Sequence, residues 1–145
     1  MQQKQIYGII FYVIKLKPDL RMKGAKMNIK LYKENLKNEV IDPMFEYLTE
    51  EGEDCGFTKK DIAKCEDIIS KYLAALDGIK KPDDKKTMKE VKAVVLALNK
   101  LNKRTNYSII ETMEREAIWE IIQTSAVECG LSNPSDDITE EWREW

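Results

Sequence analysis

Acidic side chains at helical spacing cluster between residues 111 and 120, where they surround a single arginine. The cluster contains Glu111, Glu114, Arg115, Glu116 and Glu120. Glutamates of this kind hold metal ions between the helices of carboxylate-bridged bundles, where histidine accompanies them at i+3. This sequence contains no histidine, and a hard cation bound by carboxylates alone needs several helices to converge. We therefore predict no metal site.

Catalytic chemistry has little support in the rest of the sequence. The absence of histidine removes the commonest general base and pH switch. No serine occupies a nucleophile elbow, and the six glycines are too scattered to form a phosphate-binding loop. The three cysteines, Cys55, Cys65 and Cys129, include no C-x-x-C pair, which fits reduced thiols in the cytoplasm. The sequence predicts a cytoplasmic protein with no catalytic residue and no cofactor.

Arg115 has a structural and a catalytic interpretation. Neighbouring carboxylates could clamp its guanidinium in a bidentate pair, either inside the protein or at an interface. In a helical enzyme that works through Lys, Arg and Glu alone, Arg115 and either Glu111 or Glu114 would instead line a cleft. Such a cleft would also need a lysine from another helix, so its shape would distinguish the two interpretations.

Tryptophans accompany the acidic residues in the C-terminal part of the chain, where residues 105–145 carry ten acids and two bases. Tryptophan is enriched at binding hot spots, and a negative surface speeds encounter with a basic protein. The predicted partner-binding residues are Glu111, Glu114, Arg115, Glu116, Trp119, Glu120, Trp142 and Trp145. The alternative is a C-terminal segment that folds back, so that Trp142 and Trp145 cover the protein's own core.

A lysine-rich section spans residues 79–104, with nine basic and three acidic residues. Lysines of this kind bind phosphates in nucleic-acid interfaces. The section holds only one arginine, Arg104, and no aromatic residue, and the acidic C-terminal part would repel a polyanion. We therefore predict a solvated face and no nucleic-acid partner. Contact between this face and the acidic face of a second copy stays open and would give a homodimer or larger homo-oligomer.

Residues 1–26 differ in composition from the rest of the chain. Residues 6–14 form an apolar run of nine, IYGIIFYVI, well short of the ~20 residues of a membrane helix. No small-residue cleavage site follows the run, and its β-branched and aromatic content suits a strand. A single strand and a poorly packed extension before Met27 both stay open, and we predict no membrane partner.

Apolar residues recur at helical spacing in four long segments. In residues 29–51, Pro43 either kinks one long helix or begins a second helix that Asp42 caps. The continuous apolar stripe favours the single kinked helix. Thr58 and Thr87 each precede an acid by three residues, which predicts that helices begin there. In the fourth segment the apolar positions are Ile118, Ile121, Ile122, Ala126 and Cys129.

The fourth segment covers residues 111–130, with Thr112 as a possible cap and Gly130 in the left-handed conformation at its end. A short last helix over residues 137–145 would place Trp142 and Trp145 on one face. The chain length fits one domain. The fold predicted for residues 27–145 is therefore a compact all-α bundle of four to five helices.

Two stretches, YSIIETMERE from residue 107 and DDITEEWREW from residue 136, resemble small bacterial immunity proteins. These proteins are cytoplasmic antidotes encoded beside toxins. The resemblance implies an acidic protein without catalysis that binds one partner protein stoichiometrically. It covers a minor part of the chain and includes no family motif, so it assigns no role to any residue.

Overall fold

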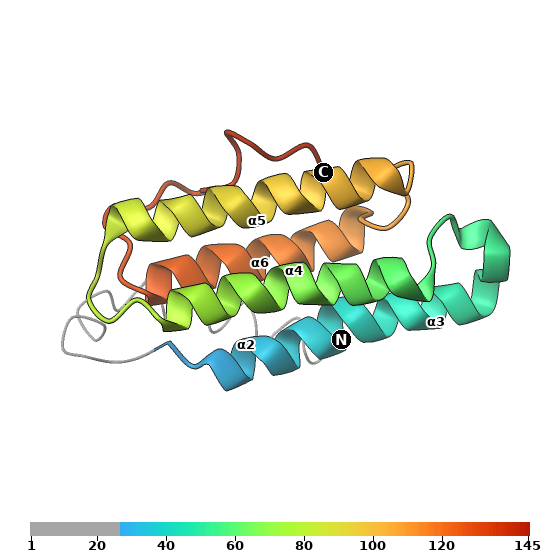
Figure 1. Ribbon diagram of the computed structural model, residues 1–145, viewed down its shortest axis with the longest axis horizontal. Helices are drawn as coiled ribbons and strands as arrows, with labels where there is room; N and C mark the ends of the chain where they lie inside the picture. Colours follow the sequence, from blue (N-terminus) through green and yellow to red (C-terminus); the bar gives the residue numbers. More distant parts are fainter. Residues whose placement is uncertain (1–26) are drawn as a thin grey trace.

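The computed structural model describes residues 27–145, which form an all-α bundle (Figure 1). Its elements are α2 (Ile29–Leu36), the π-helical turn η2 (Lys37–Ile41), α3 (Asp42–Glu51), the 3-10 turn η3 (Gly52–Cys55), α4 (Lys59–Asp77), α5 (Asp84–Arg104) and α6 (Thr112–Glu128). No strand occurs in this range. The predicted all-α fold is confirmed, whereas the strand or extension expected in residues 1–26 lies outside the described residues.

α2, η2 and α3 form one continuous helical rod, so Pro43 does not begin a separate helix (Figure 1). In the turn before Pro43, the N–H of Asp42 donates to the carbonyl of Lys37, five residues earlier. The apolar residues of the rod recur every four positions and would drift around a helix of 3.6 residues per turn. The wider π turn corrects this drift, and positions 32, 36, 40 and 44 are all buried. The interpretation as one helix is confirmed, and Asp42 is not a cap.

α4 and α5 form an antiparallel hairpin (Figure 1). Thr58 caps α4 as predicted, because its hydroxyl accepts a hydrogen bond from the N–H of Asp61 at 3.3 Å. In return, Asp61 Oδ2 accepts one from the N–H of Thr58 at 2.9 Å. This reciprocal pair satisfies two main-chain donors at the beginning of the helix.

The predicted beginning of α5 at Thr87 is wrong. The cap is Asp83, whose Oδ1 accepts a hydrogen bond from the N–H of Lys86 at 3.0 Å. Aspartate caps helices as well as threonine does, so the helix gains one more turn. Thr87 lies inside the helix and is completely buried, with its hydroxyl facing the thiol of Cys129 at 4.0 Å.

α6 is enclosed on several sides, because it contacts α2, η2, α4 and α5. The predicted apolar stripe is confirmed for Ile118, Ile121, Ile122 and Ala126, each at most 1% exposed. Its last member, Cys129, is only partly buried. Gln123, Thr124 and Ser125 are buried as well, so the second half of the helix has no solvated face. The expectation of a simple amphipathic helix is therefore wrong for this half.

Both ends of α6 have defined caps. Thr112 is the first residue of the helix rather than its cap, and the N–H of Glu111 before it donates to Glu114 Oε2 at 3.3 Å. At the other end Gly130 has φ +105°, and the N–H of Leu131 donates to the carbonyl of Ala126 at 3.3 Å. Gly130 thus ends the helix in the predicted left-handed conformation.

Residues 131–145 cross α5 and α6 without forming the predicted last helix (Figure 1). Two buried amides take up main-chain groups of this C-terminal segment. Asn99 donates to the carbonyl of Trp142 at 2.7 Å and accepts from the N–H of Glu144 at 3.0 Å. Gln123 bonds in the same way to Ser135 and Ile138, at 2.8 and 2.9 Å. The segment therefore pairs with side chains of the bundle instead of with itself.

One hydrophobic core joins the rod, α4, α5, α6 and the C-terminal segment, to which it extends through Leu131, Ile138 and Trp145. The four long helical segments fall within the predicted number of four to five. Within residues 27–145, each helix is too short or too polar to cross a membrane.

Candidate functional site

An acidic groove lies between the rod and the first half of α6. It has a volume of about 290 Å³ and is lined by Glu39, Pro43, Met113, Glu114, Glu116, Ala117 and Glu120. Four of these seven residues are glutamates, and no lysine or arginine is among them. The lining therefore creates a negative potential in a concave surface, where field lines are focused.

Helical spacing brings the lining residues to the groove from two elements. Glu39 and Pro43 are four residues apart and share one side of the rod. Met113, Ala117 and Glu120 follow at intervals of four and three, which keeps them on one side of α6. Because η2 packs directly against α6, the two rows face the same groove. The two elements run antiparallel (Figure 1).

The groove combines its carboxylates with apolar surface. Pro43, Met113 and Ala117 supply the apolar part, and 62% of Met113 is exposed. Methionine is flexible and polarizable, and it is common at surfaces that adapt to a partner. The arrangement suits a guest that is apolar along its length and cationic at its tip.

Glu39, which lines the groove, has a carboxylate oxygen without a hydrogen-bond partner in residues 27–145. Its Oε1 is buried and has no hydrogen-bond donor within the described part of the chain. A buried acceptor without a donor costs about 1–3 kcal/mol, and more when it carries charge.

The negative potential extends along α3 toward Tyr47. Partial desolvation raises the pKa of the Tyr47 phenol, and the carboxylates of Glu51, Glu111 and Glu114 raise it further. The ring stacks on Phe57 with centroids 6.1 Å apart and is 42% exposed. Tyr47 is therefore an exposed aromatic residue in the field of acidic side chains, although it does not itself line the acidic groove.

Arg115 is half-buried and lies outside the acidic groove. The salt bridges within residues 27–145 involve other residues, so no carboxylate clamps Arg115 inside this part of the protein. A clamp at an interface stays a prediction. Among the described residues that line the groove there is also no lysine. The cleft that the enzyme interpretation requires, with Arg115 beside a lysine, is therefore not this groove.

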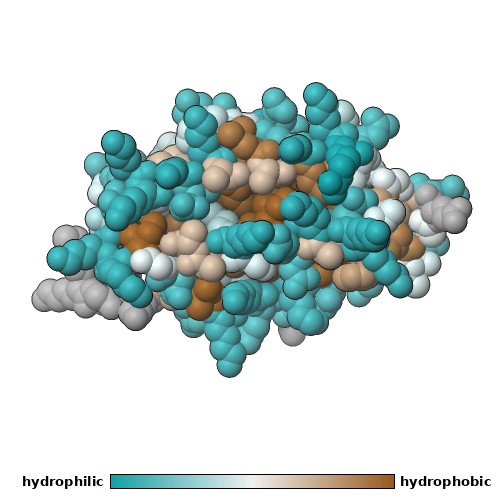
Figure 2. Space-filling model, viewed as in Figure 1, coloured by the Kyte–Doolittle hydropathy of each residue, from teal (hydrophilic) through white to brown (hydrophobic). Residues whose placement is uncertain are grey.

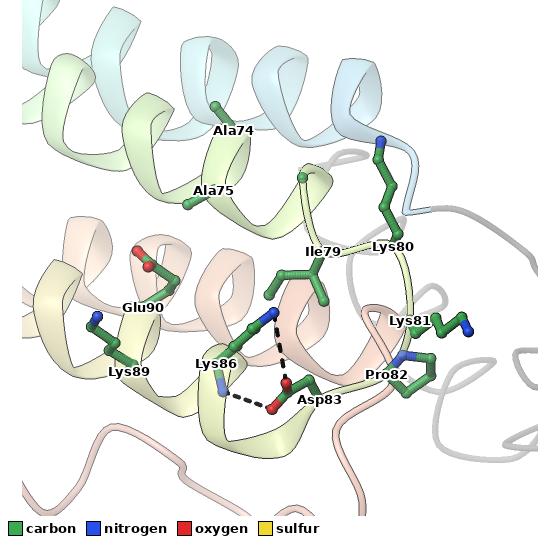
Figure 3. A pocket seen from close by; sticks show the side chains of 11 residues that line it. Ala74, Ala75, Ile79, Lys80, Lys81, Pro82, Asp83, Lys86, Lys89 and Glu90 are labelled. Carbon is green, nitrogen blue, oxygen red and sulfur yellow. Dashed lines mark hydrogen bonds and ion pairs between the residues drawn. The ribbon is translucent and has the colours of Figure 1, made fainter.

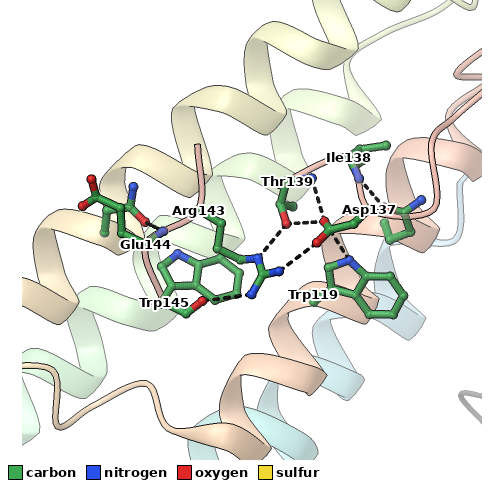
Figure 4. A network of polar contacts seen from close by, with 9 residues as sticks. Trp119, Asp137, Ile138, Thr139, Arg143, Glu144 and Trp145 are labelled. Atoms are coloured by element: carbon green, nitrogen blue, oxygen red, sulfur yellow. Dashed lines mark hydrogen bonds and ion pairs between the residues drawn. The ribbon is translucent and has the colours of Figure 1, made fainter. Parts of the chain in front are cut away.

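The tryptophans belong to a different part of the surface, where a polar network holds the C-terminal segment (Figure 4). Asp137 is its centre. Its Oδ1 accepts hydrogen bonds from the indole N–H of Trp119 at 3.0 Å and from the hydroxyl of Thr139 at 2.5 Å. Its Oδ2 forms a salt bridge with Arg143 at 2.8 Å. Burial raises the pKa of Asp137, but the bonds from Thr139 and Arg143 outweigh burial and lower it.

Trp142 and Trp145 cover the bundle rather than face solvent together. Trp145 is 8% exposed and belongs to the core, and the Arg143 guanidinium lies 5.3 Å from the centre of its ring. Trp142 is half-buried, with the Lys92 ammonium 5.7 Å from its ring. This is the fold-back arrangement that the sequence analysis named as the alternative.

The structure thus divides the predicted partner-binding set in two. Glu114, Glu116 and Glu120 line the acidic groove, and Glu111 precedes them at the N-cap of the same helix. Trp142 and Trp145 instead belong to the C-terminal segment, and Trp119 bonds to it through Asp137. Sequence reasoning missed Glu39 and Pro43, which share the groove with them. Their spacing of four residues was the available signal, but it did not show which helix they would face.

In the described residues, no group of three or more acidic or cysteine side chains is arranged to hold a metal ion. No protein-family model matches the chain, and comparison with curated proteins and with solved structures finds no match either.

Proposed function

We propose that this protein is a non-enzymatic binding module whose acidic groove receives a basic side chain of a partner protein. The observation that carries the proposal is the lining of the groove, with four glutamates around the apolar surface of Pro43, Met113 and Ala117. Lysine and arginine have an apolar stem and a cationic head. The stem would lie on the apolar surface, and the head would reach the carboxylates.

Arginine fits the groove better than lysine does. Its planar guanidinium presents five N–H donors and pairs with carboxylates in a bidentate manner. In the groove these donors would meet the carboxylates of the lining glutamates.

The charge of the whole C-terminal part supports a basic protein as the partner. Residues 105–145 carry ten acids against two bases, which would steer a positively charged protein toward α6. The proposed role is that of an immunity-type inhibitor in the bacterial cytoplasm, which binds one basic protein in equal amount. It involves no nucleic acid and no membrane.

Affinity capture from the native host tests this proposal with the full chain as bait. The informative variant is Glu39→Gln/Glu116→Gln, which removes two charges from the groove and keeps the shapes of the side chains. The matched control is Glu140→Gln/Glu141→Gln, which removes two charges from exposed residues of the C-terminal segment. Each eluate is analysed by quantitative mass spectrometry.

The expected result is one basic protein recovered in equal amount with the wild-type chain and with the control. The groove variant should bind it at least tenfold more weakly, since losing one partner of a buried charge pair costs about 2–5 kcal/mol. Equal recovery on the groove variant and the control would refute the assignment to the groove. Recovery of the chain alone would favour self-association over a separate partner.

A further inference from the structure

A second groove follows the line where α4 packs against α5, and it shares no lining residue with the acidic groove. Its larger part, about 770 Å³, lies beside the turn between the two helices. Its smaller part, about 280 Å³, lies further along the hairpin. Glu90 lines both parts, so the two parts adjoin at this residue, and together we call them the lysine groove.

The floor of the lysine groove is apolar and made mostly of small side chains. Ala74 and Ala75 come from α4, Ala93 and Ala97 from α5, and Ile68 and Ile79 complete the surface. Figure 2 shows apolar atoms along this line, bordered by hydrophilic ones, and Figure 3 shows Ile79 pointing between the two helices. Alanine at these positions lets another backbone approach the hairpin closely.

Lysines border this floor on both helices and in the turn. They are Lys64, Lys71, Lys80, Lys81, Lys86 and Lys89. Lys71 pairs with Asp67 at 3.0 Å, and Lys86 lies 4.0 Å from Asp83 (Figure 3). The other four form no salt bridge with any residue from 27 to 145. The border therefore carries positive charge that salt bridges within residues 27–145 only partly neutralise.

We propose that the lysine groove docks an acidic amphipathic helix of a partner protein. A helix laid into a groove between two helices uses apolar residues at i, i+3, i+4 and i+7 as its anchors. Small apolar anchors match the alanine floor, and acids on both flanks of the helix would meet the lysines. The charge complementarity is opposite to that of the acidic groove, so the two surfaces select different partners.

The composition of the groove favours a helix over a nucleic acid as the occupant. Single-stranded nucleic acids bind where exposed aromatic rings stack on their bases. Among the described residues that line the lysine groove, the one aromatic is Tyr72. It is 3% exposed, and its hydroxyl donates a hydrogen bond to the carbonyl of Ile122 at 3.0 Å. No arginine is among the lining residues from 27 to 145, so these residues offer no bidentate arginine contacts to phosphate.

A labelled synthetic peptide tests the proposal on the full chain by fluorescence anisotropy. The probe is a helix of about 20 residues, long enough to be helical in water, with leucine and alanine on one face and glutamate on both flanks. A peptide of the same composition, shuffled so that the apolar residues share no face, controls for charge. A single-stranded oligonucleotide of equal charge represents the nucleic-acid alternative.

Two variants of residues that line the lysine groove should change the affinity for the peptide in opposite directions. Lys64→Gln/Lys89→Gln removes one unpaired lysine from each part of the groove, and exposed ion pairs contribute about two- to fivefold each. The double variant should therefore bind the amphipathic peptide about five- to twentyfold more weakly. Glu90→Gln removes the acid between the two parts and should strengthen binding about two- to fivefold.

Three controls keep these results specific to the groove. Lys30→Gln/Lys33→Gln makes the same charge change at exposed residues of α2 and should leave affinity unchanged. Ala93→Gln puts a helix-compatible side chain on the floor without changing charge, and it should weaken binding. The acidic-groove variant Glu39→Gln/Glu116→Gln should not affect the peptide, so the two proposals can fail separately.

Several outcomes would overturn the assignment. One is equal affinity for the amphipathic and shuffled peptides, which would mean that charge alone attracts them. Another is a loss of peptide affinity in Lys30→Gln/Lys33→Gln that equals the loss in Lys64→Gln/Lys89→Gln. Tighter binding of the oligonucleotide than of the amphipathic peptide would assign the groove to nucleic acid instead.

Discussion

The indole N–H of Trp119 in α6 donates a hydrogen bond to Oδ1 of Asp137 in the C-terminal segment, at 3.0 Å. Eighteen residues of chain separate the two, including the end of α6 and the turn at Gly130. The bond fixes the segment against the side of α6 that would otherwise be solvated. Together with Gln123, one turn further along α6, it explains why the second half of this helix is buried.

Asp137→Asn should destabilise the protein at neutral pH. The carboxylate accepts bonds from Trp119, Thr139 and Arg143, and losing the charge weakens all of them. We expect a loss of about 1–3 kcal/mol in the free energy of unfolding at pH 7, measured by urea denaturation. Glu140→Gln, a neighbouring exposed carboxylate, should change stability by less than about 0.5 kcal/mol.

The same variant should show a defined pH dependence. Because the pKa of Asp137 is lower in the folded protein, its stabilising contribution is present above its unfolded-state pKa of about 3.9 and is lost as pH falls below it. The free energies of unfolding of wild type and Asp137→Asn should therefore differ most at about pH 6–7 and converge below about pH 4. If the difference in unfolding free energy stayed constant down to about pH 3, one unit below that pKa, the charge of Asp137 would not be the cause of the difference.

Trp145→Ala should destabilise the protein more than Trp142→Ala does. Trp145 is 8% exposed within the core, so its truncation should cost about 3 kcal/mol or more. Trp142 is half-buried beside Lys92, and its truncation should cost about 1 kcal/mol. Thermal unfolding measures both, and a Trp145→Ala variant as stable as the wild type would contradict the fold-back arrangement.

Gly130→Ala should destabilise the junction between α6 and the turn that precedes α5. Gly130 has φ +105°, and an added Cβ would lie 2.8 Å from Pro82. The left-handed conformation alone costs a non-glycine residue about 1–2 kcal/mol, so a total of about 2 kcal/mol or more is expected. Gly78→Ala is the control, because its φ of −76° suits alanine and its added Cβ would come no closer than 3.4 Å to its neighbours.

Cys65 should resist alkylation in the folded protein. Burial raises the pKa of its thiol to about 12, and the residue is completely buried in α4. The thiolate is the form that reacts with iodoacetamide. At about pH 8, half a unit below the pKa of a free thiol, Cys65 should therefore be modified only as fast as the protein unfolds. Peptide mass spectrometry of a labelling time course measures this, and rapid labelling before unfolding would show that α4 opens locally.

Local patterns in the sequence determined the helices. The Thr58 and Asp61 capping pair, the left-handed Gly130 and the apolar stripe of α6 depend on residues within one or two turns of each other. Such interactions can be predicted because helical geometry places residues three and four apart side by side. Even so, Thr87 was misassigned, because Asp83 offered a cap of equal quality one turn earlier.

Only the tertiary structure decided which surfaces these helices share. Glu39 and Glu116 belong to different helices, and the packing of η2 against α6 brings them to one groove. The C-terminal segment has the spacing of a helix, but Asn99 and Gln123 bind its main chain and keep it extended over the bundle. The physical reason is that buried main-chain groups must find partners. Side chains distant in sequence supplied those partners here, and a local pattern contains no information about them.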